Sequence, residues 1–204
     1  MITNHRLEKF KRVAALRQEM TVIFENVHDP HNIGAVLRSC DSVGIQEVYI
    51  LYTEDNLTID KLKEIDSTAT GVRKWMNVHV FRDAAACFKA VREKYDLILA
   101  THLNKEAKAL HDLELTGKIA FLFGNEHAGI SEESLKYSDH NFIIPQFGMA
   151  QSLNISVACA VTLYEALRQR MNSDMYTKDF ENISESAQGL YAHYVAKHEE
   201  RYQR

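Results

Sequence analysis

The sequence predicts an α/β fold in which a mainly parallel sheet carries helices on both faces. Five short apolar runs have the length of buried strands and are bounded by turn residues: 21–27, 47–51, 96–103, 118–124 and 141–145. Segments with helical periodicity lie between them, at 33–43, 83–95 and 152–170. Strands that alternate with helices predict a parallel sheet, because each connection between parallel strands crosses one face of the sheet.

The predicted helices have start signals and apolar stripes. Asn32 or His31 is expected to cap the helix over 33–43, and Gly44 suits the position after its end. Asp83 is expected to cap the next helix, and Ser152 the one over 152–170. The expected inward stripes are Ile33, Val36, Leu37 and Cys40 in the first, Phe88, Val91 and Tyr95 in the second, and Leu153, Val157, Ala160, Val161 and Tyr164 in the third.

The two ends of the chain are expected to form helices of their own. Within 1–20, five Lys and Arg residues outnumber two Glu residues, so an amphipathic helix there carries a local charge of +3. Apolar residues within 174–204 share one helical face, which is expected to pack on the body or on a second subunit. We therefore divide the chain into a basic helix (1–20), an α/β domain (21–170) and a helical extension (171–204).

Composition narrows the functional classes. The chain has 204 residues, of which 46% are hydrophobic and 25% are charged, so one well-buried domain with terminal additions is expected. Neither a membrane span nor a secretory signal is predicted, since no apolar run is long enough. Three cysteines lie far apart inside apolar runs, which favours reduced core thiols and a cytoplasmic protein. The net charge of −4 argues mildly against a nucleic-acid partner, but the charge is unevenly distributed.

Three polar loops follow predicted strands, at 28–38, 124–131 and 146–154. Open α/β sheets bind ligands at the carboxyl ends of their strands, so these loops form the expected site. In the first loop, Arg38 either pairs with Asp41 on the helix surface or contacts an anionic substrate. His28 and His31 could suggest a metal site, but no third ligand follows at a recognisable spacing.

The second and third loops have both structural and functional interpretations. Gly124 and Gly129 allow tight turns and a close approach of backbone to a ligand, or form an ordinary loop into a short helix capped by Ser131. In the third loop, core packing does not require Asn154 or Ser156. Polar side chains beside the exposed N–H groups of a helix start favour an anionic or hydroxylic ligand.

Together, the three loops resemble the SpoU/TrmH-type class of SPOUT RNA methyltransferases. The first family motif, an Asn followed six residues later by an Arg, matches Asn32 and Arg38. The second, G-x-E-x-x-G after a buried strand, matches Gly124, Glu126 and Gly129. The third matches Ile144, Pro145, Gly148, Met149, Ser152, Leu153 and Asn154. The motifs occur in family order, and the resemblance covers residues 20–170.

This resemblance implies a fold, a cofactor and a substrate. The fold is a Rossmann-like α/β domain with a deep trefoil knot in its C-terminal part. The cofactor is S-adenosylmethionine, with contacts carried over by position to Thr101, Leu122, Gly124, Ile144, Ser152 and Leu153. The class is homodimeric, and the apolar face of 152–170 is a candidate interface. The similarity is closest to the TrmH type, which methylates the ribose of a D-loop guanosine in tRNA, and ribosomal RNA is the alternative substrate.

The resemblance also implies roles for particular side chains. The class's favoured proposal makes Arg38 the base, although removing a proton from an arginine at pH 7 costs roughly 7–9 kcal/mol. Alternatively, Arg38 is a fixed cation that holds the phosphate and stabilises the developing 2′-alkoxide, while Glu126 or a water takes the proton. Ser152 and Asn154 are expected to orient Arg38 and the ribose, and Asn32 to hold the first loop.

The expected RNA contacts lie near the N-terminus and around the tryptophan. They are Arg6, Lys9, Lys11, Arg12, Arg73 and Lys74. Trp75 either stacks on a base or belongs to the core. No metal and no DNA partner are expected. Two further classes stay open from the sequence: a non-catalytic RNA-binding or assembly protein, and a metal hydrolase built on His28, His31 and Glu126.

Overall fold

The computed structural model of the chain describes residues 2–54, 71–177 and 179–202, with the side chains of 201 and 202 left aside. In this part of the chain, the strands pair in one parallel sheet of order β3-β2-β1-β6-β4-β7-β5. The strands are β1 (Met20–Glu25), β2 (Glu47–Leu51), β3 (Asn77–Phe81), β4 (Leu97–Thr101), β5 (Lys108–Ala109), β6 (Ile119–Phe123) and β7 (His140–Ile143).

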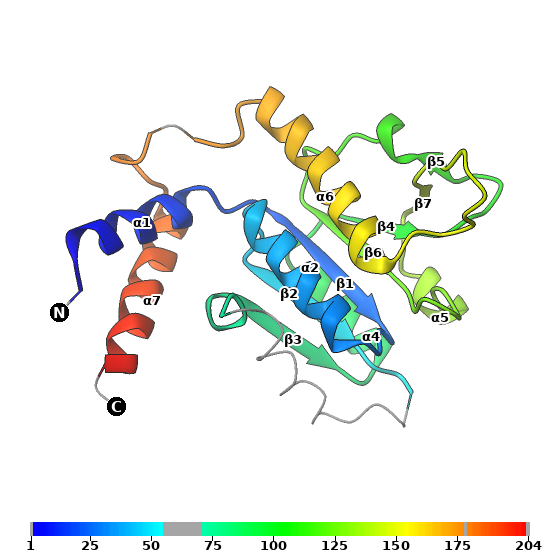
Figure 1. Cartoon of the computed structure of the whole chain (residues 1–204), viewed down its shortest axis with the longest axis horizontal. Coiled ribbons are helices and arrows are strands. Elements are labelled where there is room, and N and C mark those ends of the chain that lie inside the picture. The colour runs from blue at the N-terminus through cyan, green and yellow to red at the C-terminus, as the bar shows by residue number, and fades with distance from the viewer. Residues whose placement is uncertain (1, 55–70, 178, 203–204) are drawn as a thin grey trace.

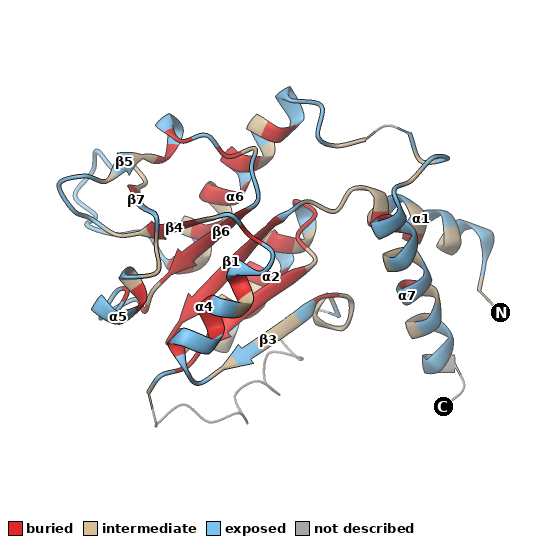
Figure 2. Ribbon diagram, turned by 180° about the vertical axis from the view of Figure 1, so that it is seen from behind, coloured by how far each residue is buried: buried red, intermediate tan, exposed pale blue. Residues whose placement is uncertain are grey.

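Helices cover both faces of this sheet, as the sequence predicts (Figures 1 and 2). Their bounds are α1 (Asn4–Ala15), α2 (Pro30–Ser42), α4 (Ala84–Arg92), α5 (Glu132–Leu135), α6 (Ile155–Asn172) and α7 (Glu185–Tyr202), with 3₁₀ turns η1 (Arg73–Trp75) and η2 (Leu110–Asp112). Helices α2 and α6 lie on one face and α4 on the other. Within the described residues, no helix is both long and apolar enough to cross a membrane.

The central strands are buried on both sides, which is why they read as continuous apolar runs. Along β1, Phe24 packs into the core beneath α2 and α6, and its neighbour Ile23 packs into the core beneath α4. The predicted stripes of α2 and α4 are buried, which confirms their orientation. The edge strands β3 and β5 were not predicted, because β3 is half-exposed and β5 has only two residues.

Helix α6 corrects the sequence prediction in two ways. Asn154, not Ser152, caps it, because the Asn154 side chain accepts a hydrogen bond from the Ser156 N–H. Its buried residues include Ile155, Cys159, Leu163 and Ala166. Of the predicted inward stripe, Val157 and Tyr164 face outward, at 46% and 52% exposed, whereas Val161 packs partly against the core. The helix carries two apolar stripes, and the sequence alone does not say which one meets the sheet.

Helix α2 also begins differently from the prediction. Asp29 caps it, accepting a hydrogen bond from the His31 N–H at 2.8 Å, so neither Asn32 nor His31 is the cap. Pro30 then occupies the first helical position, where its fixed φ suits the helix and its missing N–H costs nothing. Gly44 follows the end with a φ of +86°, as predicted. With the cap assigned to Asp29, the Asn32 side chain is available for other contacts.

The N- and C-terminal helices pack on each other, side by side at one end of the molecule (Figures 1 and 2). Phe10 and Ala14 of α1 share a small apolar cluster with Ala187 and Tyr194 of α7. Trp75 of η1 packs against the same cluster. The predicted face of the C-terminal extension therefore packs on α1 and, through Tyr194, on Trp75 and Gln46 of the α/β domain, which confirms the expected packing on the body.

Candidate active site

A chain of side-chain hydrogen bonds joins the three predicted loops. Asn154 donates from Nδ2 to Oδ1 of Asn32 at 3.1 Å, and Asn32 donates from Nδ2 to Oε1 of Glu126 at 2.7 Å. Asn154 uses its own Oδ1 to accept hydrogen bonds from the N–H and the hydroxyl of Ser156. Each motif therefore contributes one polar side chain to a single network at the carboxyl edge of the sheet.

The loop after β6 is shaped to present Glu126 at its tip. Asn125 and Gly129 exchange two backbone hydrogen bonds of 2.9 Å, which closes the loop. The Asn125 side chain donates to the Asn26 carbonyl at 2.7 Å and accepts from the backbone N–H groups of His127 and Ala128. A Cβ added to Gly124 would lie 2.2 Å from the Gly129 carbonyl carbon and oxygen. Gly124 is thus required by the fold of this loop.

A buried carboxylate that the sequence analysis missed anchors the same loop. Glu25, at the end of β1, is almost fully buried. Its oxygens accept hydrogen bonds from the N–H and hydroxyl of Ser131 and from the hydroxyl of Ser134. Three donors replace the water that the carboxylate loses, which makes its burial tolerable. The signal in the sequence is a single acid at the end of an apolar strand.

The predicted cofactor residues lie at one edge of the sheet. The Thr101 hydroxyl donates to the Leu122 carbonyl at 3.2 Å, which ties the ends of β4 and β6 together. Gly124 directly follows β6, and Ile144 directly follows β7, which pairs with β4 on its other side. Ser152 and Leu153 lie on the exposed loop that returns from β7 to α6. The structure therefore groups the first four residues, with the other two on the connecting loop.

The exposed loop leaves its polar backbone groups uncommitted. Across 146–153, no residue in the described structure takes part in a hydrogen bond to the rest of the protein. Phe147 and Met149 are 99% and 100% exposed on it. Free N–H and C=O groups beside apolar side chains match the needs of a ligand that combines a polar amino acid, a nucleoside and a methyl-bearing sulfonium. The residues present fit S-adenosylmethionine.

Arg38 lies in a different environment from the amide network. It is exposed on α2 and lines a wide groove of about 450 Å³ with Ser156, Val157 and Tyr164 of α6. In the described residues no hydrogen bond joins Arg38 to Asn154 or Ser152. Of the two alternatives for Arg38, the surface pairing with Asp41 is not formed, because Asp41 binds the Arg17 guanidinium at 2.8 Å. The Arg38 guanidinium is left facing the groove.

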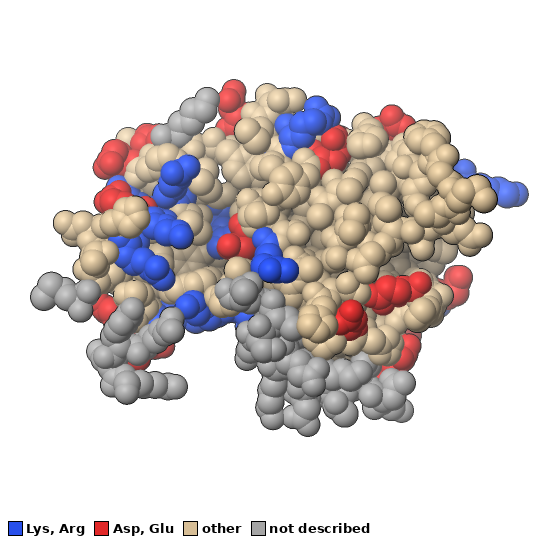
Figure 3. Space-filling view, viewed as in Figure 1, with Lys and Arg blue, Asp and Glu red and all other residues tan. Residues whose placement is uncertain are grey.

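The predicted RNA-binding cations divide into two groups. Lys11 pairs with Glu181 at 3.3 Å, and the Arg12 guanidinium lies 5.7 Å from the centre of the Phe180 ring, so both contact the C-terminal extension. The cations Arg6, Lys9 and Lys74 line a cavity between α1 and η1. Arg73 lies beside Lys74 in η1. Figure 3 shows Lys and Arg gathered over the α1 end of the molecule.

The two histidines of the first loop do not form a metal cluster with their neighbours. His28 Nε2 lies 3.4 Å from a carboxylate oxygen of Glu54, and His31 is exposed in the first turn of α2. Among the residues the structure describes, no group of three His, Cys, Asp or Glu side chains is placed to hold a metal ion.

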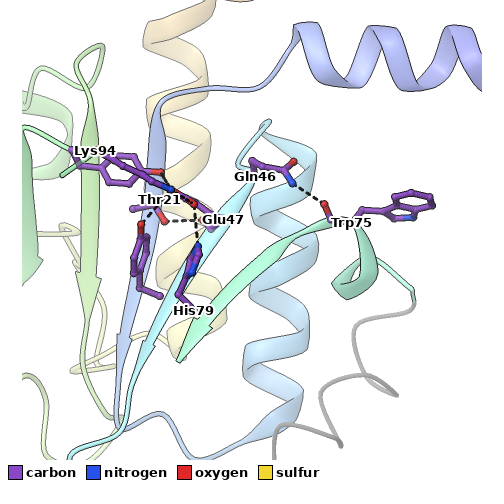
Figure 4. Close-up of polar contacts among 8 residues, drawn as sticks. Thr21, Gln46, Glu47, Trp75, His79 and Lys94 are labelled. Carbon is purple, nitrogen blue, oxygen red and sulfur yellow. Dashed lines mark hydrogen bonds and ion pairs between the residues drawn. The ribbon is translucent and has the colours of Figure 1, made fainter. Parts of the chain in front are cut away.

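A second polar cluster lies at the amino ends of the strands, around Glu47 (Figure 4). Glu47, at the start of β2, accepts hydrogen bonds from Lys94 and Tyr95 and contacts His79 at 3.0 Å. Burial alone would raise the pKa of Glu47, but the hydrogen bonds from His79, Lys94 and Tyr95 and the positive charge of Lys94 lower it to about 2. The cluster lies at the amino ends of the strands, away from the amide network.

The model of the SpoU rRNA Methylase family matches residues 19–164. The chain belongs to this family. Among curated SpoU relatives, the tRNA (guanosine(18)-2′-O)-methyltransferase of Thermus thermophilus is 37% identical over 177 residues, which cover 86% of this chain and 89% of the relative.

Two solved SpoU structures resemble the fold. The A. aeolicus TrmH/SpoU tRNA modifying enzyme superposes with a TM-score of 0.79 at 30% identity, covering 95% of this chain and 96% of its own. The SpoU methyltransferase AviRb from Streptomyces viridochromogenes, in complex with the cofactor AdoMet, gives a TM-score of 0.67 at 25% identity. That match covers 76% of this chain and 62% of AviRb.

Proposed function

We propose that this SpoU protein is an S-adenosylmethionine-dependent RNA methyltransferase that methylates the ribose 2′-oxygen of a D-loop guanosine in tRNA. The observation that carries the proposal is the Asn154–Asn32–Glu126 network, which joins one residue from each family motif at the carboxyl edge of the sheet. The Thermus relative supports the substrate, since its name states that it acts on guanosine 18 of tRNA.

The cofactor is held, in this proposal, by the ends of β4 and β6 and by the loop before α6. Thr101, Leu122 and Gly124 provide one wall, and the uncommitted backbone of Ser152 and Leu153, with Ile144 below it, provides the other. S-adenosylmethionine supplies a methyl group on a positively charged sulfur. An apolar pocket suits this chemistry, because the transfer leaves a neutral thioether.

Arg38 acts here as a fixed cation at the RNA phosphate. Its guanidinium has no partner among the described residues, so its donors are available to a phosphate oxygen. The same charge stabilises the 2′-oxygen as it loses its proton. Glu126 keeps Oε1 bonded to Asn32 and presents its other oxygen to accept that proton, either directly or through a water. Asn154 sets this arrangement by holding Asn32.

The protein acts as a homodimer in this proposal. Val157 and Tyr164 form an exposed apolar stripe on α6 beside the Arg38 groove. A second copy that covers the stripe would remove this apolar surface from water and enclose Arg38. The catalytic site would then contain groups from both subunits.

The finer organisation of the chain follows the same family resemblance. We keep the division into a basic helix (1–20), a methyltransferase domain (21–170) and an extension (171–204), and place the protein in the cytoplasm because its three cysteines are free and buried. A trefoil knot in the C-terminal part is supported by the end of α6, where Arg170 donates to the carbonyls of Leu115 and Gly117. The segment before β6 therefore contacts the end of the helix that follows β7.

One assay tests the proposed activity. The full chain is incubated with S-adenosylmethionine labelled in its methyl group and with unmodified tRNA transcripts, and methylated nucleosides are identified by mass spectrometry. We expect 2′-O-methylguanosine from the D-loop, and no product when that guanosine is replaced by its 2′-deoxy form. Incorporation at a base, or none into any RNA, would contradict the proposal.

Ribosomal RNA is the second candidate substrate, because the family description names it. The same assay on ribosomal RNA fragments separates the two. Methylation confined to ribosomal RNA would keep the chemistry and replace the substrate. A non-catalytic RNA-binding role would instead leave the chain unable to bind S-adenosylmethionine in calorimetry.

A further inference from the structure

A cavity at the end of the molecule opposite the amide network has the lining of a nucleotide site. It lies between α1, η1 and α7, and its volume is about 290 Å³. Ligand pockets start at roughly 300 Å³, so this volume lies at the lower end for a small ligand. The aromatic rings of Phe10, Trp75 and Tyr194 line its interior. Charged side chains from α1 and η1 also line it.

The charge of this cavity is positive. Four cationic side chains line it, and one carboxylate does so. That carboxylate, Asp41, is already paired with Arg17 at 2.8 Å, so it does not oppose an incoming anion. Arg17 also donates to the Ile45 carbonyl and to the Tyr194 hydroxyl, which fixes it as part of the wall. The remaining cations come from α1 and η1.

Arg6 is the group in this cavity whose bonding is incomplete. Its guanidinium carbon lies 5.2 Å from the centre of the Phe10 ring and 5.8 Å from that of Trp75, so two rings hold it in place. Its Nε atom is buried and has no hydrogen-bond partner among the residues that the structure describes. A buried donor without an acceptor costs free energy, and a phosphate oxygen would satisfy it.

Trp75 provides the aromatic surface for a base. It is half-buried, and Lys74 Nζ lies 5.1 Å from the centre of its ring. Its backbone is fixed because the Gln46 side chain donates to its carbonyl at 2.9 Å (Figure 4). Single-stranded RNA is bound in this way, by bases that stack on aromatic rings beside cations that hold the phosphates.

We propose that this cavity binds one unpaired nucleotide of the RNA substrate, with its phosphate at Arg6 and its base against Trp75. The proposal rests on the proposed function for the identity of the polymer. The cavity lies near the amino ends of the strands, next to Gln46 at the start of β2, whereas the amide network lies at their carboxyl ends. A five-residue strand separates them by roughly 17 Å, so this nucleotide is not the one that is methylated.

The only tryptophan of the chain reports directly on this site. The intact protein is titrated with a single-stranded hexauridylate, with uridine monophosphate and with inorganic phosphate, and the fluorescence of Trp75 is followed. We expect saturable quenching by the hexauridylate and by the mononucleotide, and at least fivefold weaker binding for both to Arg6→Gln. Arg6→Lys keeps the charge but lacks the planar guanidinium, so its affinity should lie between those of the unchanged protein and Arg6→Gln.

The matched control is Lys89→Gln, which removes an exposed charge from α4 on the far face. It should bind the hexauridylate as the unchanged protein does. With a tRNA transcript, Arg6→Gln should raise KM at least fivefold and leave kcat within twofold. The slope of the logarithm of tRNA affinity against the logarithm of salt concentration should become shallower by about one. Quenching by inorganic phosphate equal to that by the mononucleotide would overturn the nucleotide assignment.

Two further outcomes separate this proposal from the proposed function. If Arg6→Gln and Lys89→Gln weaken binding equally, the cavity is not a specific site, even where methylation of tRNA is established. If instead the cavity binds the hexauridylate through Arg6 while no tRNA is methylated, the nucleotide site stands and the proposed substrate is wrong. Melting temperatures of all variants, measured without RNA, show whether a loss of binding reflects a loss of fold.

Discussion

Asn32 donates a hydrogen bond to Glu126 at 2.7 Å, although the two residues are 94 positions apart in the chain. Since Asn154 holds the other end of the Asn32 amide, the three loops are positioned together. The bond leaves one Glu126 oxygen available and fixes the direction in which it points. Loss of the Asn32 side chain would free both partners without disturbing the core, because neither Glu126 nor Asn154 is buried.

We therefore expect Asn32→Ala to lower kcat for tRNA methylation by roughly 10- to 100-fold, because small misplacements of reacting groups carry costs of this size. S-adenosylmethionine affinity should change by less than about threefold. Asn154→Ala should lower kcat by a similar factor. The double variant should lose much less kcat than the product of the two single-variant losses. Asn172→Ala, on an exposed amide at the end of α6, is the control. Independent, additive losses would show that the network does not act as a unit.

Gly124→Ala should unfold or loosen the loop after β6. The added Cβ would lie 2.2 Å from the Gly129 backbone, which cannot rotate away as a side chain can. We expect a loss of roughly 1–3 kcal/mol in the free energy of unfolding, measured with urea, and weaker binding of S-adenosylmethionine. Gly117→Ala is the matched control, since its Cβ would make only an ordinary contact, at 4.0 Å to Ile119 Cγ1, and Gly117 lies outside the proposed cofactor loops. Equal stability of the two variants would contradict this view of the loop.

Arg38 can be tested as a fixed cation against Arg38 as the base. Arg38→Lys keeps the charge and loses the bidentate fork, so we expect about a 10- to 100-fold loss of kcat with an unchanged pH–rate profile, and a larger loss for Arg38→Ala. If an arginine were the base, lysine would release its proton more readily, and the variant would gain activity relative to the unchanged protein at alkaline pH. Single-turnover rates between pH 6 and pH 10 decide between the two.

The sequence predicts those parts of the fold where the apolar pattern allows a single orientation of a helix or strand. Helix α2 has a single apolar stripe, so Val36 and Leu37 could be placed in the core in advance. Helix α6 has two apolar stripes, and only packing against the sheet decides that Cys159 is inside and Val157 outside. Likewise, a half-exposed edge strand such as β3 carries too weak a signal to be predicted.

The candidate site divides in a similar way. The motifs identify Asn32, Glu126 and Asn154, but their mutual hydrogen bonds depend on how distant segments meet and cannot be derived from spacing. Glu25 was missed because one acid in an apolar run resembles the end of a strand, and its serine partners lie more than 100 positions away. The cavity around Trp75 is assembled from four separate segments, so no local pattern indicates it.

The Glu47 cluster should make stability depend on acid pH. The folded pKa of Glu47 is about 2, below the ordinary value of 4.5, so the unfolded chain binds the proton more tightly. Its contribution is therefore fully present above pH 4.5 and is lost as the pH falls from 4.5 towards 2. Glu47→Gln should lower the free energy of unfolding at pH 7 by on the order of 2 kcal/mol and flatten its slope between pH 4.5 and pH 3. Urea titrations across this range measure both, and an unchanged slope would contradict the assignment.

Dimer formation should depend on the exposed stripe of α6. Val157 is 46% exposed beside the Arg38 groove, and a charge there would have to be buried if a second copy covers it. We expect Val157→Glu to raise the dimer dissociation constant at least tenfold in analytical ultracentrifugation, equivalent to about 1.4 kcal/mol, and to lower tRNA methylation with it. Val80→Glu provides the control, because Val80 is similarly exposed, at 38%, on the distant edge strand β3. An unchanged dimer in Val157→Glu, or a monomeric unchanged protein with full activity, would place the complete site within one chain.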